Sequence, residues 1–291
     1  MASSPLVRRR RLGRELHRLR QDAGLTSEQL ARRIRGGSRF KISRLENAVG
    51  RPDPAEVVAI LEALGMAEGK TMDTMLTMAG DAATRGWWES YDALGERQKV
   101  YADLEYGAQT VREYQPVVVP GLLQTRAYTR ARSTSWRLPG EPPDASEVQD
   151  ALDAKAMRQR VLARDEGPRY EVVLDEVAIR RLAAPPNVMR DQLLHLVEAG
   201  RTEKVTIRVL PLNARITDYW LPRSPFSQYV YGDGDPLVTA VDTETEDLVY
   251  DSPDDVAPYT ELYSRLAVAA LAPEASVRYL SRAAAELEAV E

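Results

Sequence analysis

The chain has 291 residues and no cysteine, and this absence excludes several kinds of site. Without thiols it can have no disulfide framework, no thiolate zinc site, no iron–sulfur cluster and no cysteine nucleophile. Long apolar runs are also missing. No stretch is long enough to span a bilayer, and no apolar segment follows the basic N-terminus as it would in a signal peptide. We therefore expect a cytoplasmic, nucleoid-associated protein without a membrane partner.

Histidine is almost as scarce, since the chain contains only His17 and His195. Two histidines so far apart do not have the spacing of a zinc site, and a lone helical histidine is more often structural than catalytic. The sequence also lacks a Walker A motif, a Gly-x-Gly-x-x-Gly turn and a Gly-x-Ser-x-Gly elbow. We therefore expect no enzyme activity, no catalytic residue, no metal and no cofactor.

Two acidic segments allow a functional and a simpler interpretation. Asp175-Glu176 is either a paired acid site or the acidic start of a short helix, and we favour the helix start because a strand precedes it. Gly232-Asp233-Gly234-Asp235 resembles a fragment of a calcium loop, but the glutamate at position twelve of such a loop is missing. We predict a hairpin turn there.

Lysine is rare too, and 34 of the 39 basic residues are arginine. Charged residues are unevenly distributed along the chain. Residues 1–64 contain 14 basic and 7 acidic residues and carry +7, whereas the rest of the chain carries −12. This asymmetry favours a polyanion-binding segment joined to an acidic module over a merely solvated basic face. We interpret the run Arg8–Arg11 as part phosphate-binding arm and part solvated helix start.

The basic segment has the pattern of three short helices. Leucines recur at helical spacing in the first, which Gly24 ends. Thr26 and Gln29 form a capping box at the start of the second. The turn Arg35-Gly36-Gly37 then leads into the third. Two short amphipathic helices joined by a glycine-containing turn are typical of a DNA-reading helix-turn-helix.

The first turn of the third helix supplies the candidate base contacts. Ile42 and Leu45 face the core, so the polar side chains around them face outward. Arginine grips guanine O6 and N7 in a bidentate manner, worth about 1–3 kcal/mol of discrimination, and we assign this role to Arg39 and Arg44. The full set of candidate DNA contacts is Ser38, Arg39, Phe40, Lys41, Ser43, Arg44, Asn47, Arg51, Thr26 and Gln29.

Some of these assignments leave alternatives open. Phe40 either touches a thymine methyl group or completes the core. Asn47 and Arg51 lie past the helix end, where backbone phosphates are usually met. Amphipathic segments at 57–64 and 66–79 follow, and we place the DNA-binding domain at residues 1–80.

Residues 81–291 mix helices with short strands. We predict helices at 94–111, 148–163, 176–182, 188–199, 253–271 and 273–288, and another that starts at Leu122 after a turn at Pro120-Gly121. We predict strands or extended segments at 117–119, 170–174, 205–210, 226–231, 237–241 and 247–250. Because no β-α-β rhythm is visible, the predicted fold class is α+β. An all-α helix-turn-helix domain precedes a larger mixed helix and antiparallel-sheet domain.

An aromatic set opens this larger region, which we predict to be a regulatory or partner-binding domain. The set is either core at a domain boundary, which we favour, or a pocket or docking surface, for which tryptophan and tyrosine are often used. The residues that would bind a partner or ligand in the second case are Trp87, Trp88, Tyr91 and Tyr114.

Two family resemblances cover nearly the whole chain. Leu25-Thr26-x-x-Gln29-Leu30-Ala31, Ile42–Asn47 and Arg51-Pro52 resemble the lambda-repressor-like (XRE) helix-turn-helix family, although the turn at residues 35–37 is a residue longer than the common form. That difference leaves the register of Ser38 and Arg39 in the groove open.

The second resemblance lies downstream of these helices. Val119–Thr125, Val173–Glu176 and Val205–Pro211 occur in the order seen in the actinomycete family of WhiJ-like, antitoxin-like regulators. The arginine-rich composition is consistent with such a source.

These resemblances imply a transcriptional regulator, of the repressor type, that binds double-stranded DNA as a homodimer. Its C-terminal domain would respond to a ligand or to a small protein encoded by an adjacent gene. The alternative is an antitoxin-type interaction protein that mainly binds a small cognate protein and uses DNA binding for autoregulation.

Overall fold

The computed structural model describes residues 3–66, 68–91, 94–134, 145–232, 234–243 and 245–288, and the chain forms two compact units. The first unit comprises Met1–Ser90, Lys99–Gly107 and Tyr231–Pro236, and the second comprises Tyr91–Gln98, Ala108–Val230 and Leu237–Glu291. The N-terminal unit therefore takes in two segments from much later in the chain. The predicted boundary after residue 80 falls within a helix.

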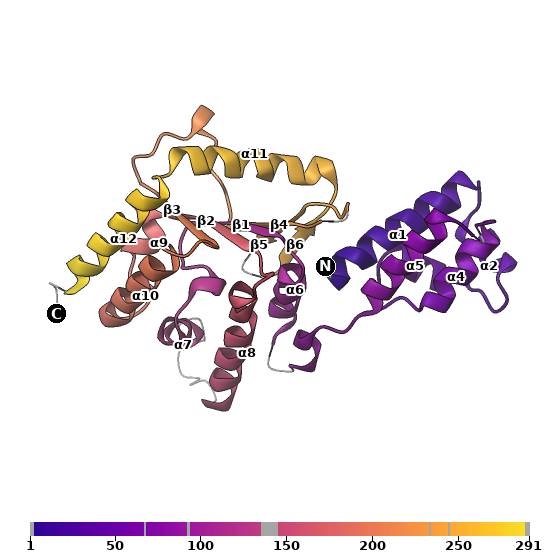
Figure 1. Cartoon of the computed structure of the whole chain (residues 1–291), viewed down its shortest axis with the longest axis horizontal. Coiled ribbons are helices and arrows are strands. Elements are labelled where there is room, and N and C mark those ends of the chain that lie inside the picture. The colour runs from indigo at the N-terminus through magenta and orange to yellow at the C-terminus, as the bar shows by residue number, and fades with distance from the viewer. Residues whose placement is uncertain are drawn as a thin grey trace. The chain divides into compact units, whose positions relative to one another are not determined.

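The first unit is a bundle of short helices (Figure 1). Its elements are α1 (Pro5–Asp22), α2 (Ser27–Arg33), α3 (Arg39–Glu46), α4 (Pro54–Ala63), α5 (Lys70–Ala83), the 3-10 turn η1 (Trp87–Ser90) and the C-terminal part of α6 (Glu96–Glu105). Leucine, isoleucine and methionine side chains from the first five helices form one core. The helices predicted from the leucine spacing and from 57–64 and 66–79 are confirmed.

The arginine run Arg8–Arg11 lies in the first half of α1, where Arg9, Arg10 and Arg11 are partly exposed. Ser4 caps the helix by accepting a hydrogen bond from the Val7 amide, and Arg8 is buried. Within the same unit, Arg8 pairs with the buried carboxylate of Asp235 at 3.0 Å, and Arg11 pairs with it at 2.8 Å. The run is therefore part of a helix, as the helix-start interpretation predicts, and not a separate arm; Arg8, Arg9 and Arg11 form ion pairs within the unit.

Asp103, from α6, secures the start of the same helix. Its carboxylate accepts from the Ser4 hydroxyl at 2.6 Å and from the Leu6 amide at 3.0 Å, and Arg9 lies 3.6 Å away. Burial raises the pKa of Asp103 even though these three groups favour its charged form. A carboxylate from beyond residue 100 is thus part of the N-terminal helical unit.

The second unit is built on one six-stranded sheet. Its strands are β1 (Thr110–Gln115), β2 (Arg169–Asp175), β3 (Val205–Leu210), β4 (Phe226–Val230), β5 (Val238–Asp242) and β6 (Asp247–Tyr250), in the order β3-β2-β1-β4-β5-β6. The β1-β2 and β2-β3 pairs are parallel, and the other three are antiparallel. The predicted α+β class is confirmed, as is the predicted hairpin between β4 and β5.

The parallel half of the sheet departs from the sequence prediction. Helices connect β1 to β2 and β2 to β3, so a β-α-β rhythm is present after all. The sequence pattern predicts a helix through residues 110–111 and an extended segment only at 117–119, whereas β1 spans Thr110–Gln115. Strand β1 contains Arg112, Glu113 and Gln115, which hide its strand character, whereas the predicted strands at β3 and β6 are correct.

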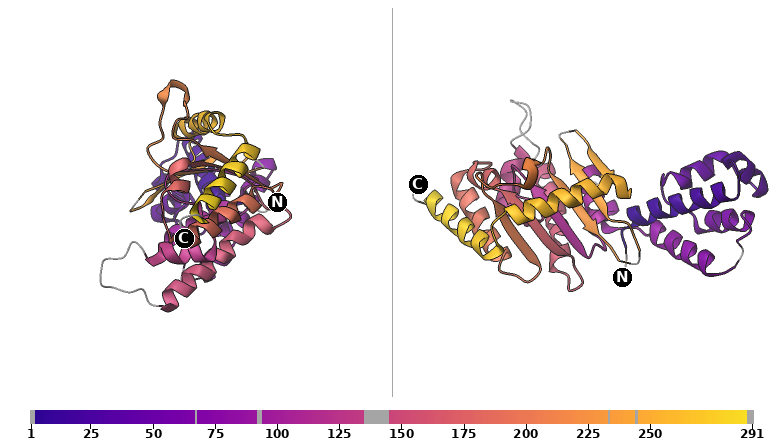
Figure 2. Two further views of the ribbon diagram at one scale, coloured as in Figure 1. Left: turned by 90° about the vertical axis from the view of Figure 1, so that its left-hand side faces the viewer. Right: turned by 90° about the horizontal axis from the view of Figure 1, so that it is seen from above.

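Helices cover both faces of this sheet (Figures 1 and 2). On one face α11 (Pro253–Ala269) packs across the strands, and on the other lie α7 (Arg126–Thr134), α8 (Ala145–Ala163) and α10 (Pro186–Ala199). The short α9 (Glu176–Arg180) begins at Asp175, whose carboxylate accepts from the Val177 amide at 3.0 Å. This confirms the helix start over the paired acid site. The last helix, α12 (Pro273–Glu288), packs against α10 and β3.

The string Val119–Thr125 is an irregular segment held by glutamine side chains. It contains the 3-10 turn η2 (Gly121–Leu123), so the helix predicted from Leu122 begins only at Arg126. Gln124 Nε2 donates to the Val119 carbonyl at 2.7 Å, and Gln159 Nε2 donates to the carbonyls of Gly121 at 3.0 Å and Gln124 at 2.8 Å. Gln192 uses both ends of its amide group. Its Nε2 donates to the Leu123 carbonyl at 2.7 Å, and its Oε1 accepts from the Thr125 amide at 2.7 Å. The side chains replace the backbone pairing that a regular element would supply.

Replacing Gly13 with alanine should destabilise the first unit, although alanine is the better helix former. A Cβ at Gly13 would lie 2.6 Å from the Glu46 carbonyl oxygen and 2.7 Å from that of Leu45, so α1 and α3 would have to separate. We expect Gly13→Ala to cost about 1–3 kcal/mol, as overpacking does. The matched control is Gly80→Ala in α5, where nothing lies within 4 Å and a gain of up to about 1 kcal/mol is expected. Urea unfolding of both variants checks the prediction, and equal effects would contradict it.

Replacing Gln192 with methionine should destabilise the second unit. The substitution keeps the side-chain length but leaves the Leu123 carbonyl and the Thr125 amide without their partner, at about 1–3 kcal/mol for each buried group. The control is Gln149→Met on the exposed side of α8, which should change stability by less than about 0.5 kcal/mol. Thermal unfolding followed by circular dichroism measures the stability of both variants. An unchanged unfolding midpoint for Gln192→Met would contradict the stabilising role that we assign to this residue.

Candidate nucleic-acid interface

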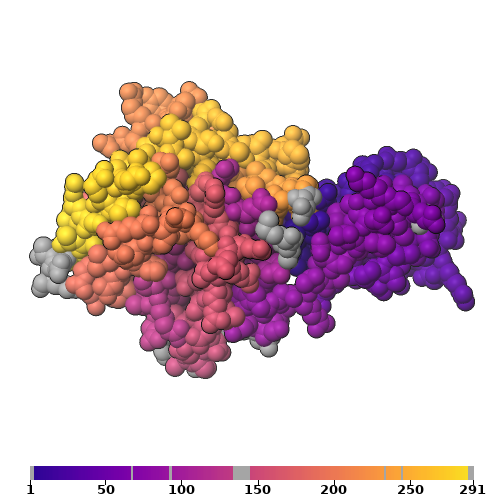
Figure 3. Space-filling view, viewed as in Figure 1, coloured from indigo at the N-terminus to yellow at the C-terminus, as the bar shows by residue number. Residues whose placement is uncertain are grey.

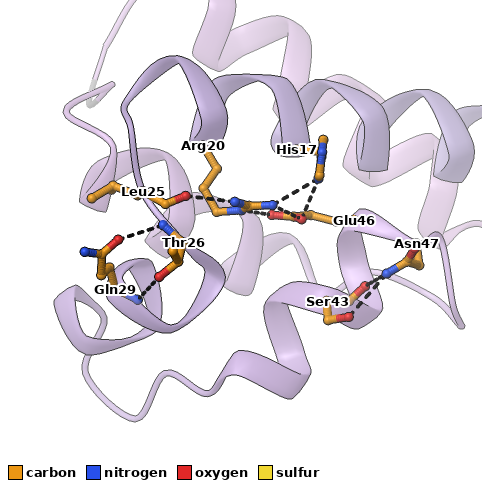
Figure 4. A network of polar contacts seen from close by, with 8 residues as sticks. All are labelled: His17, Arg20, Leu25, Thr26, Gln29, Ser43, Glu46 and Asn47. Atoms are coloured by element: carbon orange, nitrogen blue, oxygen red, sulfur yellow. Dashed lines mark hydrogen bonds and ion pairs between the residues drawn. The ribbon is translucent and has the colours of Figure 1, made fainter.

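Two short helices and their caps position the predicted DNA-reading surface. The capping box at the start of α2 is present: Thr26 Oγ1 accepts from the Gln29 amide at 3.2 Å, and Gln29 Oε1 accepts from the Thr26 amide at 2.8 Å (Figure 4). Helix α3 begins with Ser38 as its N-cap, whose hydroxyl accepts from the Lys41 amide at 3.2 Å. Thr26, Gln29 and Ser38 therefore fix backbone ends, whatever else they contact.

The turn between the helices needs both of its glycines. Gly36 has a φ of +71°, a conformation that L-residues rarely adopt. A Cβ at Gly37 would lie 2.5 Å from the Ala31 carbonyl oxygen, so only glycine fits there. The turn delivers Ser38 to the N-cap position and Arg39 to the first helical position, which settles the register of α3 within this unit.

The first turn of α3 presents its side chains to solvent. Arg39 and Lys41 are exposed, and Phe40 is 76% exposed. Ile42 and Leu45 are buried, as predicted. Phe40 therefore does not complete the core, and the interpretation in which it contacts a partner is the one that fits its exposure.

Arg44 lies differently from the sequence prediction. Its side chain is only 29% exposed, and Nη2 donates to Glu56 Oε2 on α4 at 3.0 Å. Lys41 Nζ lies 2.8 Å from Glu56 Oε1, so one carboxylate holds both cations. Arg44 is therefore less exposed than we expect from the sequence, because it pairs with Glu56, and its base contact stays a prediction.

The remaining predicted contacts are also engaged within the unit. The side-chain Nδ2 of Asn47 donates to the Ser43 carbonyl at 2.7 Å and to its hydroxyl at 3.2 Å, which closes the end of α3. Arg51 pairs with Glu89 of η1. The structure thus brings Arg39, Phe40 and Lys41 together on one exposed turn, whereas Ser43, Asn47 and Arg51 lie toward or beyond the other end of the helix.

A salt-bridge network behind α3 was not predicted from the sequence (Figure 4). Arg20 of α1 donates from Nε to Glu46 Oε1 at 2.6 Å and from Nη2 to Glu46 Oε2 at 2.7 Å. Its Nη1 donates to the Leu25 carbonyl at 2.8 Å, and His17 Nδ1 lies 2.9 Å from Glu46 Oε2. One arginine therefore links α1, the entry to α2 and the end of α3.

This network sets the charge state of Glu46. Burial raises the pKa of the carboxyl, but the hydrogen bonds from Arg20 and His17 oppose it, and the net effect lowers the pKa below 4.5. The same bonds raise the pKa of Arg20. The pair is ionised at neutral pH, and it joins α1 to the end of α3.

Comparisons with known families agree with this geometry. Residues 11–73 match a family model described as a helix-turn-helix domain, which supports the predicted XRE-like regulator. Residues 98–282 match the family described as "Domain of unknown function (DUF5753)". The chain belongs to the DUF5753 family. No curated protein and no solved structure matches the chain. Among the described residues, no helix is long and apolar enough to cross a membrane.

The four aromatic residues proposed for partner binding are divided between the two units. Trp88 is buried in the first unit and packs edge-on against Tyr106 at 5.4 Å between ring centroids, with Trp87 beside it. Tyr114 is buried in the sheet of the DUF5753 region, and Tyr91 belongs to the second unit. For Trp88 and Tyr114 the core interpretation is therefore correct.

The DUF5753 region contains perturbed carboxyls that the sequence did not reveal. Glu113 is buried in the sheet, where burial raises its pKa although the Tyr170 hydroxyl (2.5 Å) and the Gln115 amide (2.8 Å) donate to it. Burial and the neighbouring Asp247 raise the pKa of Asp242 to about 6. A strand pattern shows which side chains share a face but not which carboxyls lose their water, so such residues are found only in the folded chain.

Replacing Glu46 with glutamine should destabilise the helix-turn-helix. Because the exchange leaves the buried Arg20 without its counter-ion, we expect a cost of about 3–5 kcal/mol in urea unfolding at neutral pH. Since the folded pKa of Glu46 is lowered, its stabilisation is present above pH 4.5 and is lost as pH falls through the folded pKa. The wild-type loss of stability below pH 4.5 should therefore be smaller in the variant.

Two further variants make this test specific. Glu28→Gln removes an exposed partner of Arg32 on α2 and should cost less than about 1 kcal/mol. Arg20→Met combined with Glu46→Gln should recover part of the single-variant loss, because no unpaired buried charge remains. Equal losses for Glu28→Gln and Glu46→Gln would contradict a structural role for the network.

Proposed function

We propose that this protein is a sequence-specific DNA-binding transcriptional regulator, of the repressor type, that inserts the first turn of α3 into the major groove. The observation that carries the proposal is the exposure of Arg39, Phe40 and Lys41 on the second helix of a helix-turn-helix. Base edges in the major groove are met by residues at this end of a recognition helix. An exposed phenylalanine has no role in stability there, but it can contact a thymine methyl group.

Arg39 is the main base-reading residue in this proposal. It is exposed at the first helical position, whereas Arg44 is tied to Glu56. A guanidinium reads guanine O6 and N7 with two parallel hydrogen bonds. Lys41 stands beside it and, with its charge partly balanced by Glu56, is placed to meet a phosphate.

The protein would act as a homodimer on a two-fold symmetric operator. A pair of such helices would lie about 34 Å apart in successive major grooves. We further propose that the DUF5753 region catalyses no reaction and instead receives a small partner protein or a ligand, in the manner of the WhiJ-like, antitoxin-like regulators that the sequence resembles. Such a signal would shift the population of DNA-competent states.

Replacing Arg39 should weaken specific binding far more than non-specific binding. The operator is first obtained by mapping bound DNA across the genome of the native host, and gel shifts then compare it with a scrambled duplex. We expect Arg39→Ala to lose about 10- to 100-fold on the operator, and Arg39→Lys nearly as much, because lysine keeps the charge but not the bidentate fork. Binding to the scrambled duplex should change little with Arg39→Lys.

The control for this test is Arg18→Ala. Arg18 lies exposed on α1 in ion pairs with Glu15 and Asp22, so its removal changes net charge without touching α3. If Arg39→Lys binds the operator as tightly as the wild type, Arg39 contacts only phosphate. If the wild-type protein binds no genomic site above background, the proposed function is wrong.

A further inference from the structure

The second unit contains a cavity of about 760 Å³ between a surface loop and the N-terminal half of α11. The loop includes the 3-10 turn η3 (Thr217–Tyr219) and continues through residues 220–224 toward β4. In Figure 3 its orange atoms project from the surface next to those of α11. A volume of this size lies in the range of small-molecule sites.

Aromatic rings form much of the cavity lining. Tyr250 and Tyr259 stack with centroids 6.1 Å apart, and Phe226 packs against Tyr259 at 5.2 Å. Tyr219 and Trp220 contribute from the loop and are both exposed. A soluble protein gains no stability from holding such side chains in water, whereas the electron-rich faces of tyrosine and tryptophan attract cations.

Two of the three charged residues among the described residues that line the cavity are acidic. Asp254 and Asp255, in the first turn of α11, line it together with one basic residue among the described lining residues, Arg223. Burial raises the pKa of Tyr259, and the nearby Tyr250 and Asp255 raise it further. The field of these groups therefore reaches the aromatic wall and disfavours an additional negative charge there.

The loop is held in a strained conformation that presents these rings. Asp218 and Tyr219 have φ values of +57° and +54°, which non-glycine residues rarely adopt. Arg265 of α11 anchors the loop through Asp218 at 2.7 Å. The same guanidinium lies 5.3 Å from the ring centroid of Trp220, so a cation already stacks on one of the aromatic residues that line the cavity. Strain of this kind persists where the surrounding structure fixes it, and it is concentrated at ligand-binding sites.

We propose that this cavity binds a small organic ammonium ion, whose alkyl groups contact the aromatic wall and whose charge faces Asp254 and Asp255. The two carboxylates would repel an anion, and a neutral apolar ligand would gain no electrostatic attraction from them. This site is separate from the DNA-reading surface, and the inference does not depend on the proposed function.

Titration of the full-length protein with choline tests the site, with 3,3-dimethylbutan-1-ol as the uncharged isostere. The chain has four tryptophans, so the indole N–H signal of Trp220 can be assigned in a nitrogen-15 NMR spectrum by its loss in Trp220→Leu. We expect choline to shift this signal and to leave that of the buried Trp88 in place. The neutral alcohol should bind at least tenfold more weakly.

Variants separate this site from non-specific binding. Asp254→Asn and Trp220→Leu should each weaken choline binding at least fivefold in calorimetry. Asp191→Asn, an exposed aspartate on α10, should leave it unchanged. Asp254 is exposed, so its variant stays informative if the tryptophan variant unfolds. Equal affinity for choline and its neutral isostere, no shift at Trp220, or unaltered binding by Asp254→Asn would each overturn the proposal.

Discussion

The bidentate contact between Arg20 and Glu46 is the constraint on which the position of α3, the candidate DNA-reading helix, depends. It crosses the interface where Gly13 lets α1 approach the backbone at the end of α3. A helix of eight residues has little stability of its own, so α3 takes its position from such tertiary contacts. The buried ion pair adds orientation to a contact that apolar packing alone would leave less specific.

The number of basic residues in the first unit does not measure how much positive charge it has available to bind DNA. Arg8 and Arg11 meet the carboxylate of Asp235, Arg20 meets Glu46, and Arg44 meets Glu56. These arginines tie helices and loops together within the unit. The positive charge that is left for a polyanion is therefore smaller than the composition suggests, and Arg39 in the first turn of α3 is among the exposed arginines.

Local patterns in the sequence are sufficient to predict many of the helices, turns and strands of this structure. The capping box at Thr26, the glycine turn and the alternating strand Val205–Leu210 each encode their conformation within a few residues. Strand β1 was missed because Glu113 is a buried acid whose partner, Tyr170, lies 57 residues away. Arg44 was misplaced for the same reason, since helical spacing gives its direction but not the presence of Glu56 on the next helix.

Asp103 and Asp235 give the N-terminal unit an unusual dependence on the rest of the chain. When the ribosome has made the five helices α1 to α5, the carboxylates that secure the start of α1 have not yet been synthesised. The unit reaches its full set of contacts only once the β4-β5 hairpin has emerged. A fragment cut after α5 would therefore contain the basic helix α1 without these two carboxylates.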